Sequence, residues 1–198
     1  MKVKVYIGVI GSGKDFMAKK ETDIQLAFAD ALREDVWDIL GWRPKTQEEY
    51  EEFKEQKWKL PGDRLYYFTG RNILERYGTD IRRKEDPDYW AKKLVDKLIL
   101  FNSIDVPLYP GKLPPNKCII GITDCRFENE IVHLIKFSDK YSVPLTFVHT
   151  DYKSDKYNDK SEHPSEKIAQ QFVGFTGSQE EFNKLIWDKY GKWNKYGR

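Results

Sequence analysis

Cysteine is scarce in this chain: only two of the 198 residues are cysteines, Cys118 and Cys125. Their spacing matches neither a zinc-ligand motif nor a C-x-x-C redox pair. A chain of this length buries about 70% of the surface that its unfolded form exposes, so it needs no disulfide or metal to hold a core. These observations predict one domain that folds in a reducing, intracellular compartment.

Long apolar runs and a charge of one sign are lacking as well. No stretch approaches the roughly 18 apolar residues of a membrane span, and the apolar start of the chain is too short for a signal peptide. Lys and Arg total 34 and Asp and Glu total 32, a net charge of +2. This near-balance argues against a polybasic membrane binder and against a protein that coats nucleic acid. The sequence therefore predicts a soluble, cytoplasmic protein with neither kind of partner.

What the chain contains instead is an alternation of β-branched runs and helical patterns. We expect strands over residues 3–9, 23–27, 117–123 and 144–149, and an edge strand over 171–175. We expect helices over residues 13–20, 29–40, 46–58, 69–77 (ended by Gly78), 86–102, 126–141 and 178–190. Strands separated by helices indicate an α/β fold with a parallel sheet. Ligands of such sheets bind beyond the carboxyl ends of the strands.

The loop after the first strand, GVIGSGKD at residues 8–15, nearly matches the phosphate-binding P-loop G-x-x-x-x-G-K-[S/T]. Glycines let backbone N–H groups turn toward phosphate oxygens, and the following helix N-terminus adds its positive dipole end. Asp15 departs from the motif, because it stands where a hydroxyl usually contacts Mg²⁺. We interpret the loop as an ATP site, with a turn that only reverses the chain as the alternative. Its predicted ATP-binding residues are Gly8, Gly11, Ser12, Gly13, Lys14 and Asp15.

The loop after the most apolar strand, TDCRFENE at residues 123–130, is the second candidate. Asp124 can hold Mg²⁺ or orient an acceptor, and Arg126 can clamp a phosphate. Glu130 lies four residues after Arg126 on the same helix face. The alternative is a helix cap by Asp124 beside a surface Arg–Glu pair. No D-x-x-G motif follows a later strand and no N-K-x-D motif occurs, which favours a kinase over a GTPase switch.

These two loops together resemble those of phage-type deoxynucleoside monophosphate kinases. Residues 27–34 resemble the family segment F-A-D-P-L-K, with Ala31 in place of proline. Residues 71–82 resemble R-x-L-L-Q-x-x-G-T-[ED]-x-x-R, whose last arginine can align with Arg83 instead of Arg82. Residues 162–166 resemble D-H-x-S-E, with Glu162 in place of Asp. The five segments follow in order and cover the chain from residue 5 to about 190.

The resemblance implies transfer of the ATP γ-phosphoryl group, with Mg²⁺, to a deoxynucleoside 5′-monophosphate. It implies a three-layer P-loop kinase fold, in which a central parallel sheet of about five strands is flanked by helices. Residues 1–198 would form a single domain, with a helical acceptor-binding region at about 41–84 and a lid-like loop at about 150–165. A phage protein of this kind would work in the cytoplasm of its host.

The resemblance also implies roles for residues. The catalytic set comprises Lys14, Asp124, Arg126 and Arg82, and the metal ligands are Asp15 and Asp124. The substrate-binding set comprises Asp30, Arg33, Arg71, Asp80, Arg83, Trp90 and Glu130. Arg82 and Arg83 are alternatives for one phosphate contact.

For four of these residues a structural role is the alternative. Arg71 can be a solvated arginine, Asp30 and Arg33 can form an ordinary i,i+3 pair, and Trp90 can belong to a core stripe. Two other functions also fit the sequence: a P-loop kinase of a non-nucleotide small molecule, and a non-catalytic nucleotide-binding protein. The accepted bases, the choice between deoxyribose and ribose, and the oligomeric state, a homodimer included, stay open.

Overall fold

The structure is a computed structural model that describes residues 1–9, 11–60, 66–107, 110–150 and 167–194. The chain divides into two compact units. The sheet unit comprises Met1–Phe28 and Ala91–Arg198, and the helical unit comprises Ala29–Trp90. The helical unit contains the whole of the region 41–84 that the sequence assigns to acceptor binding.

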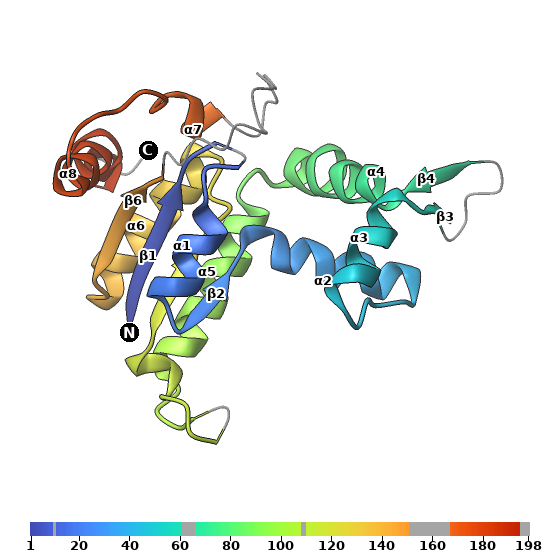
Figure 1. The fold of residues 1–198 in the computed structure, drawn as a ribbon, viewed down its shortest axis with the longest axis horizontal. Coiled ribbons are helices and arrows are strands. Elements are labelled where there is room, and N and C mark those ends of the chain that lie inside the picture. The colour runs from blue at the N-terminus through green and yellow to red at the C-terminus, as the bar shows by residue number, and fades with distance from the viewer. Residues whose placement is uncertain (10, 61–65, 108–109, 151–166, 195–198) are drawn as a thin grey trace. The chain divides into compact units, whose positions relative to one another are not determined.

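The sheet unit is built on four parallel strands in the order β2-β5-β1-β6 (Figure 1). Their bounds are β1 Lys2–Ile7, β2 Ile24–Leu26, β5 Ile119–Ile122 and β6 Leu145–His149. β1 pairs with β5 on one side and with β6 on the other, and β2 completes the sheet beside β5. The sequence predicted each of these strands, and the structure confirms the parallel α/β architecture.

The edge strand expected at residues 171–175 is wrong. Residues 171–174 form turns that continue from a short helix, and the backbone N–H groups of Gln171 and Phe172 donate to Ile168 and Ala169. Gly174 then takes a left-handed φ of 81°, which reverses the chain. The apolar pattern of this segment reflects a different purpose, because Phe172 is buried in the core.

Helices cover both faces of this sheet. They are α1 Lys14–Glu21, α5 Tyr89–Ser103, α6 Glu128–Tyr141, α7 Lys167–Gln170 and α8 Gln179–Tyr190, with the 3₁₀ turns η2 Pro115–Lys117 and η4 Gly191–Asn194. Successive strand residues point to opposite faces. In β1, Val5 packs into the core made with α5, α6 and α8, whereas Tyr6 packs against Ala18 of α1. Helix, sheet and helix thus form three layers.

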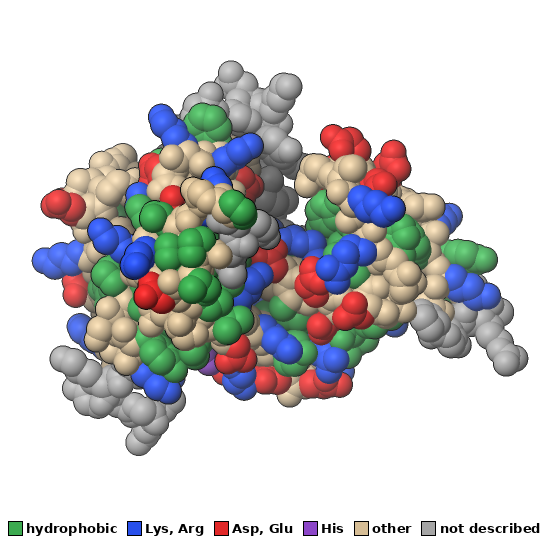
Figure 2. All heavy atoms as spheres, turned by 90° about the horizontal axis from the view of Figure 1, so that it is seen from below, with side chains coloured by type: hydrophobic (Ala, Val, Ile, Leu, Met, Phe, Trp, Pro, Cys, Tyr) green, Lys and Arg blue, Asp and Glu red, His purple; other side chains and the backbone are tan. Residues whose placement is uncertain are grey.

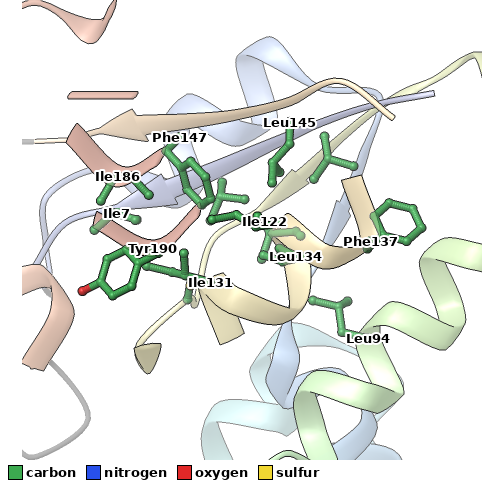
Figure 3. Packing of buried hydrophobic residues seen from close by; sticks show 14 of the residues in the cluster. Ile7, Leu94, Ile122, Ile131, Leu134, Phe137, Leu145, Phe147, Ile186 and Tyr190 are labelled. Atoms are coloured by element: carbon green, nitrogen blue, oxygen red, sulfur yellow. The ribbon is translucent and has the colours of Figure 1, made fainter. Parts of the chain in front are cut away.

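The larger core lies on the α6 and α8 face of the sheet. Figure 3 labels ten of its members, Ile7, Leu94, Ile122, Ile131, Leu134, Phe137, Leu145, Phe147, Ile186 and Tyr190. Strands covered on both faces are apolar along their whole length, as β5 is with its sequence IIGI. No helix among the described residues is long and apolar enough to cross a membrane.

The helical unit contains an antiparallel hairpin that the sequence did not predict. The elements of the helical unit are α2 Phe28–Leu40, α3 Gln47–Glu55, β3 Lys57–Lys59, β4 Tyr67–Thr69, α4 Gly70–Glu75 and the π-helix η1 Arg76–Arg83. The first residue of α2 belongs to the sheet unit. β3 and β4 form the hairpin. Thr46 caps α3 as its capping-box pattern predicted, but this helix ends at Glu55. Trp58, expected inside the helix, instead pairs with Phe68 across the hairpin.

Gly78 does not end a helix, contrary to our prediction. It lies within η1, which continues α4 to Arg83. Gly78 is buried there, and a Cβ atom at this position would lie 2.9 Å from Cδ2 of Leu32. The glycine therefore allows two helices to approach closely. A helix end also favours glycine, so the sequence alone does not separate the two roles.

Charged residues of both signs are interspersed on the face of the molecule shown in Figure 2. This distribution agrees with the near-balance of 34 basic and 32 acidic residues. A surface that binds polyanions non-specifically would instead show a continuous patch of Lys and Arg. On this face, charge that serves a function must therefore be sought at individual loops and clusters.

Gly70 is the position where the helical unit is most sensitive to a small change. A Cβ atom there would lie 2.2 Å from the carbonyl oxygen of Phe53 and 2.6 Å from its Cε1. We expect Gly70→Ala to lower the free energy of unfolding by about 1–3 kcal/mol, the usual cost of overpacking a core. Four of the six tryptophans lie in this unit, so urea unfolding followed by tryptophan fluorescence reports on it.

The matched control is Gly191→Ala, where the nearest atom to a new Cβ is 3.3 Å away, on the Trp187 ring. Gly191 has a helical backbone with φ of −68°, which alanine adopts without strain. We expect this variant to unfold within about 0.5 kcal/mol of the parent protein. Equal unfolding midpoints for the two variants would contradict the close approach at Gly70.

Candidate functional site

The loop between β1 and α1 turns at two glycines directly before the helix begins. Gly11 and Gly13 take left-handed φ values of 79° and 81°, which only glycine adopts readily. Gly13 is the N-cap of α1, and its carbonyl accepts the first helical hydrogen bond from Met17 at 2.9 Å. The N-terminal N–H groups of α1 thus follow directly on two glycines, an arrangement that favours an anion.

The base of this loop is fastened to the end of β6. Ser12 is only 2% exposed, and its Oγ lies 2.8 Å from Oγ1 of Thr150. Thr150 in turn donates its backbone N–H to Ile7 at 2.9 Å. A Cβ atom on Gly8 would lie 2.3 Å from the Thr150 carbonyl oxygen. Gly8 and Ser12, both predicted as ATP-binding residues, therefore fix the loop in place through contacts within the protein.

Lys14 supplies the positive charge of the loop. Its Nζ donates to the carbonyl oxygens of Gly8 and Val9 at 2.6 and 2.7 Å. The ammonium group therefore lies over the loop backbone rather than extending into solvent, and a phosphate bound to the loop would find it within reach. Asp15 follows on the first turn of α1 with its side chain exposed.

Asp124 lies just beyond β5, the neighbour of β1 in the sheet. Its Oδ1 accepts the backbone N–H of Phe28, the first residue of α2, at 2.7 Å. The alternative given for Asp124 was that it caps a helix. It does so, but the capped helix is α2 and not α6, the helix that follows Asp124. Because the strands are parallel, their carboxyl ends meet at one edge of the sheet, and Asp124 shares that edge with the loop that carries Lys14.

Glu130 caps the helix that Arg126 precedes. Its carboxylate is 1% exposed, and Oε2 accepts the backbone N–H groups of Arg126 at 2.7 Å and of Phe127 at 3.1 Å. These N–H groups lie at the start of α6, where helix donors need an outside acceptor. Arg126 has an exposed side chain. The structure thus gives Glu130 a structural contact, while its predicted contact with substrate stays a prediction.

In the helical unit, Asp30 and Arg33 form an ion pair on α2. The Arg33 guanidinium also lies 5.7 Å from the Tyr50 ring centroid. Burial alone lowers the pKa of Arg33, but Asp30 and Tyr50 outweigh it, so the pKa is raised. Arg71, at the start of α4, is 57% exposed and pairs with Glu55 at 3.1 Å. Arg33 is therefore held in an ion pair, whereas the Arg71 pair is more exposed.

Arg82 and its neighbours lie on η1 and the start of α5. The Arg82 guanidinium lies over the rings of Tyr77 and Tyr89, Arg83 is half-buried, and Asp80 is exposed. Trp90 is 2% exposed and donates its indole N–H to the Gly78 carbonyl at 3.0 Å. A ring buried to this extent offers no face to a nucleotide base, so the core interpretation of Trp90 is the one the structure favours.

The predicted metal ligands Asp15 and Asp124 follow two neighbouring strands, β1 and β5. Within the described ranges, no group of three or more such side chains is placed to hold a metal ion. The lid-like loop at about 150–165 lies outside the described residues except for Thr150, and so does the predicted segment at residues 162–166.

Four functional candidates were missed by the sequence analysis. Thr150 could have been found, because it directly follows a predicted strand of a parallel sheet. Tyr77 and Tyr89, which contact Arg82, and Asp35, which accepts from both tyrosines, gave no signal. Asp35 lies far from both tyrosines in the sequence, Tyr77 stands at an unspecified position of the segment 71–82, and Tyr89 belongs to no motif.

No protein-family model matches the chain, and no curated protein is significantly similar to it. The interpretation of the site therefore rests on its residues and on their arrangement in each unit.

The capping contact of Glu130 predicts a stability effect. We expect Glu130→Ala to lower the free energy of unfolding by about 1–3 kcal/mol, because two backbone donors lose their acceptor. Glu130→Gln keeps an amide oxygen at the same place and should recover more than half of the loss. Urea unfolding followed by circular dichroism measures both variants. An alanine variant as stable as the parent protein would show that the cap is dispensable.

Proposed function

We propose that the protein is an ATP-dependent kinase that transfers the γ-phosphoryl group to a deoxynucleoside 5′-monophosphate, giving the diphosphate and ADP. The observation that carries this proposal is the loop between β1 and α1. Two left-handed glycines, a helix N-terminus and the inward-lying ammonium of Lys14 make it suited to a polyphosphate. The order of the five sequence segments supports the choice of a nucleoside monophosphate as acceptor.

Lys14 and the loop backbone would hold the β- and γ-phosphates of ATP. The carboxylates of Asp15 and Asp124 offer the hard oxygen ligands that Mg²⁺ prefers, so the residues present fit this ion. When bound, Mg²⁺ neutralises charge on the phosphate oxygens. Asp124 already makes one hydrogen bond, to Phe28, and this contact fixes the direction of its side chain.

Phosphoryl transfer requires little from the protein beyond position and charge. A nucleotide 5′-phosphate is already ionised at neutral pH, so no strong base is needed. In this proposal Arg126 stabilises the transferring group, and Arg71 and Arg82 bind the acceptor phosphate. Asp30, Arg33, Asp80 and Arg83 remain further candidates for contacts with the acceptor.

A panel assay tests the acceptor class. The full-length protein is incubated with ATP, Mg²⁺ and each of dAMP, dGMP, dCMP and dTMP, and ADP formation is followed with a coupled assay. We expect at least one monophosphate to give turnover well above the rate of ATP hydrolysis without acceptor. No ADP formation with any nucleotide would overturn the proposal and favour a kinase of another small molecule or a non-catalytic protein.

Lys14→Ala tests the loop itself. We expect kcat to fall by about 10²–10³-fold, the usual effect of removing one preorganised donor from the transferring group. The matched control is Lys19→Ala, which removes the same charge from the last turn of the same helix and should keep kcat within about twofold. Circular dichroism verifies that both variants fold. If Lys14→Ala turns over at the parent rate, the loop does not bind the transferred phosphate.

A further inference from the structure

The guanidinium of Arg82 contacts two tyrosines of the helical unit, Tyr77 and Tyr89, and Asp35 accepts hydrogen bonds from both of them. We call Asp35, Tyr77 and Tyr89 the Arg82 cradle. The guanidinium carbon lies 5.2 Å from the Tyr77 ring centroid and 5.1 Å from that of Tyr89. Its Nε donates to the Tyr77 hydroxyl at 2.9 Å. Two ring faces and one directed hydrogen bond restrict the plane of the guanidinium, which a surface arginine is free to rotate.

Asp35 holds both tyrosines of the cradle. Its Oδ2 accepts the hydroxyl of Tyr77 at 3.3 Å and that of Tyr89 at 3.4 Å. The hydrogen bonds therefore run in one direction, since Tyr77 accepts from Arg82 and donates to Asp35. Burial raises the pKa of the Tyr77 phenol, so it keeps the proton that it donates at neutral pH. A single carboxylate oxygen thus contacts the hydroxyls of both rings.

The opposite edge of the Arg82 guanidinium is left for another partner. Nη1 lies 3.4 Å from Oε2 of Glu85, a long contact to a side chain that is 63% exposed. In the part of the chain that the structure describes, Nη2 donates to no acceptor. The Arg82 side chain is 35% exposed. A guanidinium edge of this kind matches two oxygens of a phosphate monoester.

We propose that Asp35, Tyr77 and Tyr89 are positioning residues that hold Arg82 with its Nη edge presented to the 5′-phosphate of the acceptor. Arg82, rather than its neighbour Arg83, is then the arginine that binds this phosphate. The inference rests on the proposed function for the identity of the ligand. The cradle itself rests only on contacts within the helical unit.

A double-mutant cycle between Tyr77 and Arg82 tests the inference. Tyr77→Phe keeps the ring but removes the acceptor of Nε–H, so we expect the KM for the best monophosphate to rise about tenfold, with kcat and the KM for ATP within about threefold of the parent values. In an Arg82→Lys background, where Nε–H is absent, Tyr77→Phe should change KM less than about twofold. Equal effects in both backgrounds would overturn the positioning role.

The matched control is Tyr67→Phe, which removes a hydroxyl from an exposed tyrosine of the same unit and should leave KM and kcat unchanged. Arg83→Lys separates the two neighbouring arginines. We expect it to raise the monophosphate KM less than Arg82→Lys does. The reverse order would assign the phosphate to Arg83 and overturn the proposal.

A measurement without turnover separates this inference from the proposed function. In ¹⁵N-labelled full-length protein, the Arg82 Nε–H signal, identified by its loss in Arg82→Lys, should be visible at neutral pH. It should disappear in Tyr77→Phe, persist in Tyr67→Phe, and shift when dTMP or dAMP is added. If these results hold but the panel gives no ADP, the proposed function fails and the inference stands.

If instead the enzyme turns over normally while Tyr77→Phe changes neither the Arg82 signal nor the monophosphate KM, the inference is wrong and the proposed function stands. A signal that depends on Tyr77 but does not shift with any of the four monophosphates would also overturn the inference, because the cradle would then not serve a phosphate.

Discussion

The close approach of Gly8 to Thr150 is the constraint on which the candidate site depends. β1 lies between β5 and β6, and its carboxyl end can lie against the end of β6 only where residue 8 has no side chain. Ser12 then contacts Thr150, and the loop turns so that Lys14 donates to the backbone carbonyl of Gly8. A side chain at residue 8 would force these groups apart. The geometry of the candidate site is therefore a consequence of how two strands end.

Much of the sheet unit could be predicted because its signals are local. Neighbouring residues alone define the short apolar strands, the glycines after the first strand and the capping boxes. Ser178 caps α8 as its box predicts. The expected edge strand failed because apolar spacing in a short segment cannot separate a strand from a turn that buries Phe172. Such spacing identifies buried residues more reliably than it identifies their backbone conformation.

The helical unit was harder to predict because its structure depends on distant partners. Trp58 leaves a helical pattern and pairs with Phe68 in a hairpin, where it packs near Trp42 with ring centroids 4.9 Å apart. Tertiary packing overrides local propensity there. The candidate site shows the same limit: Lys14 was found from a motif, whereas Asp35, Tyr77 and Tyr89 share only their position in space.

The π-helical form of η1 has a consequence for angular phase. Tyr77 and Arg82 are five residues apart, and in an α-helix such residues point about 140° away from each other. A π-helix bonds each residue to the fifth one along, which returns the two side chains to the same side. An α-helix of the same length over Arg76–Arg83 would turn Arg82 away from Tyr77. The π-helix, a rarer form than the α-helix, is therefore the one that carries the contact.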